Sequence, residues 1–508
     1  MTAPTVTPAK ATRREWIGLA VLILPCLIYS MDLTVLNLAV PHLSEALQPG
    51  AVQLLWIIDI YGFLVAGCLA TMGTLGDRIG RRKLLLIGAA AFAGGSMLAA
   101  FAPNADLLVG ARALLGIAGA TIAPSTLSLI RNMFHDDGER TFAIGVWGTS
   151  YAVGGSIGPV LGGILLEYFW WGSVFLLAVP AMALVLILGP RLIPEYKSPG
   201  AERLDLASAA LSLTAVLGVV YGLKQIAQDG LHVLPAAAIL AGIAVGVVFV
   251  RRQRRLPDPF IDLALFRKPA FSAALATNVF GVFVIFGSFL FSSQYLQLML
   301  GLSPLEAALW MLPASVTTVI GSMSAPLVVR FVPPAMVVAG GLGLCSLGFL
   351  ILTQVDGSLP LLIAGMLIAS IGLGPVFILT TDLIVGSAPP ERAGSAAAIS
   401  ETGAEFGGVF GIAVLGSIGM AVYRGMIAER IPPDVPASAA KAARDTLGGA
   451  TAAAGDLPGA TGDALLMAAR DAFATGYVTV AAISALLTLA LAVTAAFFFR
   501  KAPAPARA

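Results

Sequence analysis

Uncharged runs of about 20 apolar residues recur along this chain, and they constrain its fold more than any other feature of the sequence. A run of that length matches an α-helix that crosses a bilayer core of about 30 Å. The runs extend from Trp16 to Phe499, and only 11% of the 508 residues are charged. A soluble domain usually has about 25% charged residues. The sequence therefore predicts an all-α polytopic membrane protein.

Fourteen spans are predicted, and their even number places both termini on one side of the membrane. They cover approximately residues 16–40, 51–74, 83–102, 105–130, 139–166, 171–193, 205–226, 232–252, 270–299, 304–330, 334–353, 358–385, 393–423 and 474–499. Of the 30 basic residues, 23 lie in segments on the side of the termini and six, Lys224 among them, on the opposite side. The positive-inside rule then predicts cytoplasmic termini and a retained first span.

The sequence contains no pattern that would bind a metal or a cofactor. The three histidines lie in predicted loops without ligand spacing, and the three cysteines lie in apolar segments and cannot form a disulfide framework. The Gly-rich phosphate loop that would bind ATP is absent from the sequence, as is a nucleophile triad pattern. We therefore expect a protein that is not an enzyme, uses no cofactor and binds no nucleic acid.

Four acidic residues lie inside predicted spans: Asp32, Asp59, Glu401 and Glu405. At 1.5 Å per residue, Asp32 lies about 24 Å along the first helix, and Asp59 about 10 Å into the second helix from its outer end. Glu401 and Glu405 are four residues apart and share one helical face. An ionised carboxylate at such depth is costly, so it faces water, pairs with a cation or holds a proton. These acids can exchange a proton for a cation; the alternative for each is a structural hydrogen bond between helices.

Arg112 is predicted to be the only basic residue well inside a span. It is interpreted as a fixed counter-charge that tunes the proton affinity of Asp32. The alternative is a structural donor to backbone carbonyls.

Two glycine-rich stretches carry further patterns. The loop GTLGDRIGRRK after the second span combines turn-forming glycines with a charge network that can lock or release helix ends; its candidate gating residues are Gly73, Gly76, Asp77, Arg78, Gly80, Arg81 and Arg82. The fifth span contains GGSIGPVLGG, in which a proline bends the helix and small residues permit close packing; its residues are Gly154, Gly158, Pro159, Gly162 and Gly163. The alternatives are a topology-setting basic loop and ordinary small-residue packing.

These stretches resemble motifs of the major facilitator superfamily. The loop is similar to its loop motif, LLVGARALLGIAGATIAP to its fourth-helix motif, and GGSIGPVLGG to its antiporter motif. The opening stretch from Asp32 to Pro41 is similar to the first-helix motif of the fourteen-helix drug:proton antiporters, and WIIDIY resembles the QacA-like branch. The tenth span departs from that branch, because Gly321 to Ser324 lacks an acid; this favours monovalent over divalent cations.

The resemblance implies two six-helix bundles, over residues 1–204 and 253–508, with two inserted helices over 205–252. The outer loop 425–473 is either a helical hairpin or a flexible connector. The implied function is proton-coupled export of lipophilic, mainly cationic drugs and quaternary-ammonium antiseptics by alternating access, from a monomer in the bacterial cytoplasmic membrane, in contact with its lipids. The alternatives are a dedicated self-resistance exporter of one natural product and a flippase for lipid or envelope precursors.

Such an exporter needs an apolar cavity with acids and aromatic rings that bind flat cations. Any single aromatic residue can instead face lipid or core. The candidate cavity residues are Tyr29, Trp56, Tyr61, Trp147, Tyr151, Phe283, Phe286, Phe289, Gln294 and Trp310.

Overall fold

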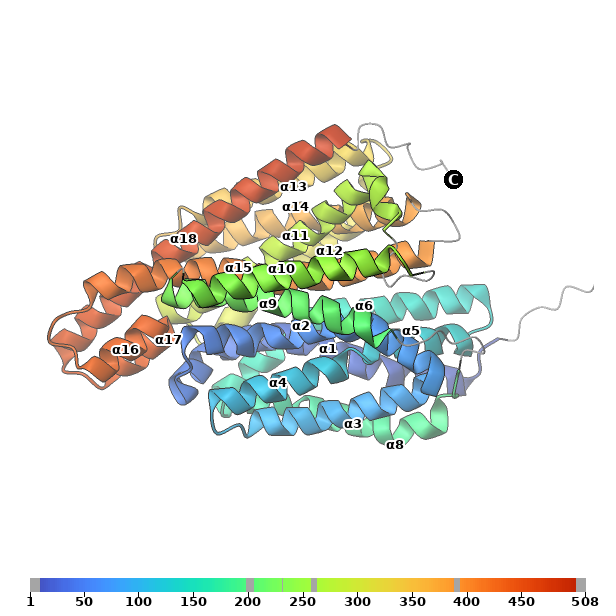
Figure 1. The fold of residues 1–508 in the computed structure, drawn as a ribbon, viewed down its shortest axis with the longest axis horizontal. Coiled ribbons are helices and arrows are strands. Elements are labelled where there is room, and N and C mark those ends of the chain that lie inside the picture. Colours follow the sequence, from blue (N-terminus) through green and yellow to red (C-terminus); the bar gives the residue numbers. More distant parts are fainter. Residues whose placement is uncertain (1–9, 198–204, 231, 257–262, 388–392, 499–508) are drawn as a thin grey trace, which may run out of the picture. The chain divides into compact units, whose positions relative to one another are not determined.

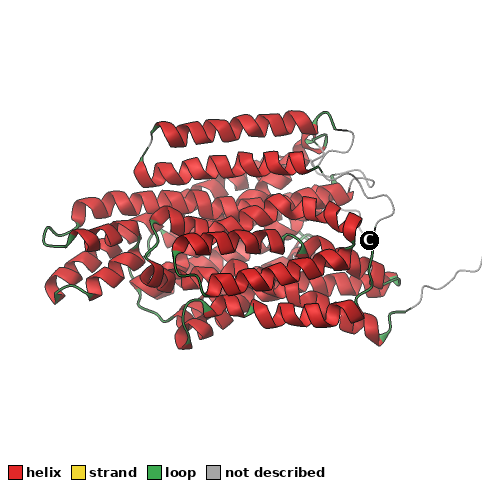
Figure 2. Ribbon diagram, turned by 60° about the horizontal axis from the view of Figure 1, so that its bottom comes forward, coloured by secondary structure: helices red, strands yellow, loops and turns green. Residues whose placement is uncertain are grey.

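The computed structural model describes residues 10–197, 205–230, 232–256, 263–387 and 393–498. Helices account for most of these residues, and no strand occurs among them (Figure 2). Within the same ranges, fourteen helical segments are long and apolar enough to cross a membrane. The all-α class and the predicted number of spans are thus confirmed.

The chain divides into two compact units. Unit 1 comprises Met1–Leu36 and Leu64–Ala209, and unit 2 comprises Asn37–Phe63 and Ala210–Ala508. The first two helices therefore contribute residues to both units. The predicted boundary at residue 204 lies outside the described residues.

Unit 1 is built from helices of the N-terminal part of the chain (Figure 1). They are the first part of α1 (Arg13–Leu47), the last part of α2 (Ala51–Ile79), α3 (Arg81–Ala100), α4 (Ala105–Gly119), α5 (Ile122–Met133), α6 (Asp137–Tyr168), α7 (Ser173–Leu176) and α8 (Ala178–Leu192). Side-chain caps set two of the starts: Asn104 accepts a hydrogen bond from the Leu107 amide (2.9 Å), and Asp136 accepts one from the Glu139 amide (3.0 Å). Together α4 and α5 form one span, interrupted by a turn.

Unit 2 contains the remaining helices. They are α9 (Leu206–Asp229), whose first residues belong to unit 1, α10 (Val233–Gln253), η1 (Leu265–Arg267), α11 (Pro269–Gln294), η2 (Tyr295–Met299), α12 (Pro304–Val328), α13 (Pro334–Leu352), α14 (Leu359–Gly386), α15 (Ala393–Arg430), α16 (Ala437–Asp445), α17 (Leu447–Gly455) and α18 (Gly459–Phe498). Proline lies in the first turn of α11, α12, α13 and α14, where its missing N–H costs no hydrogen bond. Ser303 and Glu306 add a capping box to α12.

Helices α9 and α10 form a tightly packed pair (Figure 1). A Cβ atom added at Gly222 would lie 2.6 Å from the Pro235 carbonyl oxygen, and one at Gly242 would lie 2.8 Å from the Ala215 carbonyl oxygen. Only glycine permits this approach of the two backbones. Elsewhere the pair is largely exposed: only 22% of the residues in the most apolar part of α9 are buried, and only 11% of those in α10.

The segment 425–473 is mostly helical. It begins with the last turns of α15, continues through α16 and α17, and ends within α18, beyond the ends of the neighbouring long helices (Figure 1). The Tyr423 hydroxyl donates to the Ala443 carbonyl oxygen (2.6 Å) and fastens α16 to α15. The last part of this segment, from Gly459 onward, is the start of the long helix α18 and not a separate helix.

Candidate functional site

Asp32 and Arg112 form a buried ion pair inside unit 1. Asp32 lies near the middle of α1 and Arg112 near the middle of α4, and a guanidinium N–H of Arg112 donates to the Asp32 carboxylate. Arg112 is 1% exposed and Asp32 8%. The guanidinium also lies 5.9 Å from the centre of the Phe175 ring. Each charge thus has an opposite charge beside it, without which its burial would be strongly unfavourable.

Aromatic side chains gather one turn before Asp32. Tyr29 on α1 and Trp147 on α6 both contact the Tyr151 ring edge to face, with ring centres 5.7 and 5.1 Å apart. The Trp147 indole N–H donates to the Thr126 hydroxyl (2.9 Å), and the Ser30 hydroxyl donates to the Tyr151 carbonyl oxygen (2.5 Å). Two predicted cavity residues of unit 1, Tyr29 and Trp147, therefore contact a third, Tyr151. Tyr29 lies on the helix of Asp32, and the other two lie on α6, which packs against that helix.

The glycines of the fifth span bring α6 against α1. A Cβ atom at Gly154 would lie 2.5 Å from the Leu27 carbonyl oxygen, and one at Gly158 would lie 3.0 Å from the Met31 Cα. Gly162 faces the Val35 side chain in the same way, while Pro159 and Gly163 are buried in the same helix. Every fourth residue of α6 thus contacts the turns of α1 around Asp32.

The charged loop joins α2 to α3. Asp77 and Arg81 form an ion pair of 2.7 Å, and Arg81 also donates to the Pro124 carbonyl oxygen (3.3 Å). Gly80 has φ 113°, a value that strongly favours glycine. Of the glycines in the motif, Gly76 is buried against Arg81 and Gly73 lies near Pro124. The predicted network around Asp77 is narrower than expected: Arg78 is exposed, and Arg82 has a different carboxylate partner.

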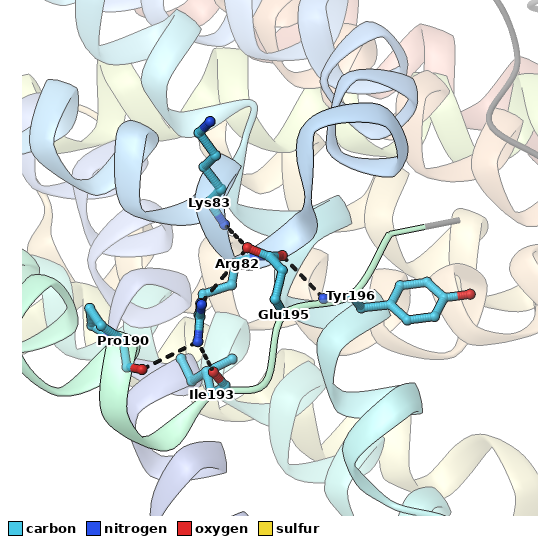
Figure 3. A network of polar contacts seen from close by, with 6 residues as sticks. All are labelled: Arg82, Lys83, Pro190, Ile193, Glu195 and Tyr196. Carbon is cyan, nitrogen blue, oxygen red and sulfur yellow. Dashed lines mark hydrogen bonds and ion pairs between the residues drawn. The ribbon is translucent and has the colours of Figure 1, made fainter. Parts of the chain in front are cut away.

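That partner is Glu195, in the segment after α8 (Figure 3). Its carboxylate accepts hydrogen bonds from the Arg82 amide (2.9 Å) and the Lys83 amide (3.1 Å), in the first turn of α3. The Arg82 side chain donates to the Ile193 carbonyl oxygen (2.9 Å) and lies 3.8 Å from the Glu195 carboxylate. A carboxylate there satisfies amides that a helix start leaves unpaired and opposes the positive end of the helix dipole. Glu195 could not be predicted from the sequence, because it lies more than 100 residues from the start of α3 and belongs to no motif.

Asp59 forms a second buried ion pair, inside unit 2. The ammonium of Lys224 on α9 donates to an Asp59 carboxylate oxygen at 2.7 Å, and both side chains are 0% exposed. The same ammonium lies 3.8 Å from the centre of the Trp56 ring. Trp56 and Asp59 are three residues apart on α2, so they share the face that α9 covers.

Lys224 was assigned above to the outer flank of its span, and the structure corrects that interpretation. A lysine near a helix end usually extends to the membrane surface. Here it is buried beside a carboxylate, so Arg112 is not the only basic residue enclosed within the spans. In the sequence, the acid Asp59 inside the second span was the only indication of an internal cation, and nothing in the spacing linked it to Lys224.

Glu405 and Glu401 lie on α15, whose neighbouring turns pack on the Asp59 region. Phe406 and Phe410 of α15 join a cluster with Phe63 and Trp56 of α2 and Val216, Leu217 and Val220 of α9. Glu405 is partly buried and Glu401 is exposed. The two helices of unit 2 that carry the predicted site acids, α2 and α15, thus meet in one aromatic cluster.

The remaining candidates of unit 2 differ in burial. Tyr61 is fully buried on α2, and Phe283 and Gln294 are buried on α11. Phe286 is partly buried and its ring lies 3.4 Å from where a Cβ atom of Gly408 would be, so it faces α15. Phe289 is partly buried, and Trp310 on α12 is 44% exposed.

Fourteen membrane spans, ion pairs enclosed within them and glycine-packed helices define a polytopic membrane transporter. Residues 22–412 match the Major Facilitator Superfamily. The chain is 43% identical to the multidrug efflux pump LfrA of Mycolicibacterium smegmatis, covering 98% of this chain and 99% of LfrA. It is 35% identical to the methyl viologen resistance protein SmvA of Salmonella typhimurium, covering 96% and 99%. It is 31% identical to the tetracenomycin C resistance and export protein of Streptomyces glaucescens, covering 99% and 95%.

A solved structure of a bacterial homologue of the human lysosomal transporter Spinster has the same fold, with a TM-score of 0.68 and 18% identity over 97% of this chain and 98% of that one. The chain belongs to the major facilitator superfamily, among its fourteen-helix drug efflux pumps. Its membership makes it a transporter and not an enzyme.

Proposed function

We propose that this protein exports lipophilic cations from the bacterial cytoplasm in exchange for protons, as a monomer with cytoplasmic termini. The observation that carries the proposal is the enclosed ion pair between Asp32, near the middle of α1, and Arg112, near the middle of α4. Two relatives, a multidrug efflux pump and a methyl viologen resistance protein, agree with it. Methyl viologen is a flat organic cation of the kind that carboxylates and aromatic rings bind.

In this proposal Asp32 carries the transported proton. When Asp32 is ionised, its attraction for the Arg112 guanidinium holds α1 and α4 together. A proton on Asp32 removes that attraction and leaves the permanently charged Arg112 without its partner. The pair therefore has two arrangements, and the glycine contacts between α6 and α1 transmit the change along α1.

The cation would bind to the acids of unit 2. Glu405, next in sequence to Phe406 of the aromatic cluster, is the main acid, and Glu401 lies one turn earlier on α15. Asp59 is a further carboxylate, three residues from Trp56 of that cluster. Monovalent cations are the proposed main substrates, because α12 has no acid at residues 321–324 that could bind a second positive charge. Its one acid, Glu306, belongs to the capping box at the helix start.

Ethidium transport in proteoliposomes with an imposed pH gradient tests this function. We expect gradient-dependent ethidium uptake by the wild type, and loss of that uptake in Asp32→Asn and Glu405→Gln. Asp463→Asn is the matched control, since Asp463 is exposed in the first turns of α18. Gradient-independent uptake, or full uptake in both site variants, would refute proton coupling through these acids. Parallel assays with methyl viologen decide whether divalent cations are also carried.

A dedicated exporter of one natural product is the second candidate. It is favoured by one observation, the 31% identity over 99% of the chain to a tetracenomycin C export protein. An absence of uptake for ethidium and other lipophilic cations, together with uptake of tetracenomycin C, would select this candidate.

A further inference from the structure

Lys224 differs from everything else on its helix. The inserted pair α9 and α10 is mostly exposed, and within the described span Leu206–Ile226 Lys224 is the only charged residue. The side chain is nevertheless fully enclosed. Enclosing a lysine within a membrane span is costly, and such residues usually mark a pathway for ions or substrates.

The face of α9 that ends in Lys224 is the face that packs on the site. Val216, Leu217 and Val220 of α9 contact the cluster formed by Phe63 and Val409, one and two turns before Lys224. The helix is thereby held in a position that places the ammonium between the Asp59 carboxylate, at 2.7 Å, and the Trp56 ring, at 3.8 Å.

A carboxylate and the face of an indole ring are the two groups that bind an organic cation best in an apolar site. In this structure both groups are already taken by a cation that belongs to the chain. A purely structural contact could be made by apolar residues of the same volume, often without loss of stability. The pair therefore has the composition of a binding site and not that of a packing contact.

We propose that Lys224 is a resident cation that occupies the Asp59–Trp56 site of this exporter, and that an exported cation binds there by displacing it. The inference rests on the proposed function, in which Asp59 contributes to cation binding. The lysine head is a point charge on a flexible stem, whereas an arginine would hold a carboxylate with a planar fork. Lys224 thus releases Asp59 when a cation with a larger apolar surface competes for it.

The competition sets the affinity of the site. If Lys224 occupies Asp59 about nine tenths of the time, the apparent dissociation constant for an exported cation is raised about tenfold. The inserted helices would then adjust which cations are retained: only those whose apolar contacts outweigh the resident lysine bind at Asp59.

Ethidium binding to the purified protein in nanodiscs, followed by fluorescence anisotropy, tests the proposal with variants of opposite sign. Lys224→Met removes the competitor, so we expect about tenfold tighter binding. Lys224→Arg provides a stronger competitor, so we expect weaker binding. In the Asp59→Asn background both effects should disappear. Lys441→Met is the matched control, because Lys441 is exposed on α16.

Each outcome decides the question. If both Lys224 variants bind ethidium with the affinity of the wild type, or if their effects persist without Asp59, the pair is structural and the proposal is wrong. If Lys224→Met does not fold, Lys224→Arg alone decides, since it keeps the charge pair. If the wild type transports ethidium while the variants match its affinity, this inference fails and the proposed function stands. An absence of ethidium binding by the wild type overturns both.

Discussion

Removing one partner of the Asp32–Arg112 pair should destabilise unit 1 severely. Arg112→Met leaves an Asp32 carboxylate that is 8% exposed without its cation. Loss of one partner from a buried ion pair costs about 3–5 kcal/mol. For a body the size of unit 1, 1 kcal/mol corresponds to about 2–4 °C in the unfolding midpoint, so we expect a decrease of about 6–20 °C. The neutral double variant Asp32→Asn/Arg112→Met leaves no buried charge and should regain at least about half of the loss.

A thiol-reactive dye measures this unfolding. Cys26 is fully buried on α1 in unit 1, so with Cys68 and Cys345 replaced by serine the dye reports the opening of unit 1 alone. Unfolding of Arg112→Met within about 2 °C of the parent, or simple addition of the two single changes in the double variant, would refute this role of the ion pair.

Three further changes follow from local geometry. Gly158→Val forces a side chain into the backbone of α1, so it should lower the free energy of unfolding by about 1–3 kcal/mol and abolish ethidium transport. Gly148→Val is the control: no atom lies within 4 Å of its added Cβ, so it should retain transport. Gly80→Ala places a Cβ at φ 113° and 2.7 Å from the Glu195 carboxylate, so the unfolding midpoint should fall by the equivalent of about 1–3 kcal/mol. Burial raises the pKa of Asp445, so the folded α16 binds this proton more tightly than the unfolded segment does. Hydrogen exchange in α16, corrected for its intrinsic pH dependence, should therefore slow as the pH falls from above the raised pKa of folded Asp445 to the ordinary aspartate pKa of about 4. Asp445→Asn should remove this pH dependence.

The sequence alone predicted the fold well, because a membrane span is a local property. The length and polarity of each run are enough to identify it, and all fourteen spans were found this way. The motif glycines were also found locally, and the structure shows the close contacts that Gly154 and Gly158 permit.

Partners across the fold were not predictable in this way. Glu195 and Lys224 act on residues more than 100 positions away, and no periodicity relates such positions. Lys224 was also misleading by its place, since a lysine at the end of an apolar run is expected at the membrane surface. The expectation for Asp77 was wrong in a smaller way. It was expected to interact with Arg78, Arg81 and Arg82, and its ion pair is with Arg81, one helical turn away.

The two enclosed pairs differ in a way that suits two different tasks. Arg112 cannot lose its charge, and its guanidinium is a planar fork. Under the proposed function, the Asp32 pair therefore opens when the carboxylate itself takes a proton. Lys224 presents a single mobile ammonium, so the Asp59 pair can open when another cation replaces it. Among the described residues, each unit thus contains an enclosed acid beside an internal cation, and the chemistry of that cation decides what can break the pair. Under the proposed function, a proton would open the pair of unit 1 and an organic cation would open the pair of unit 2.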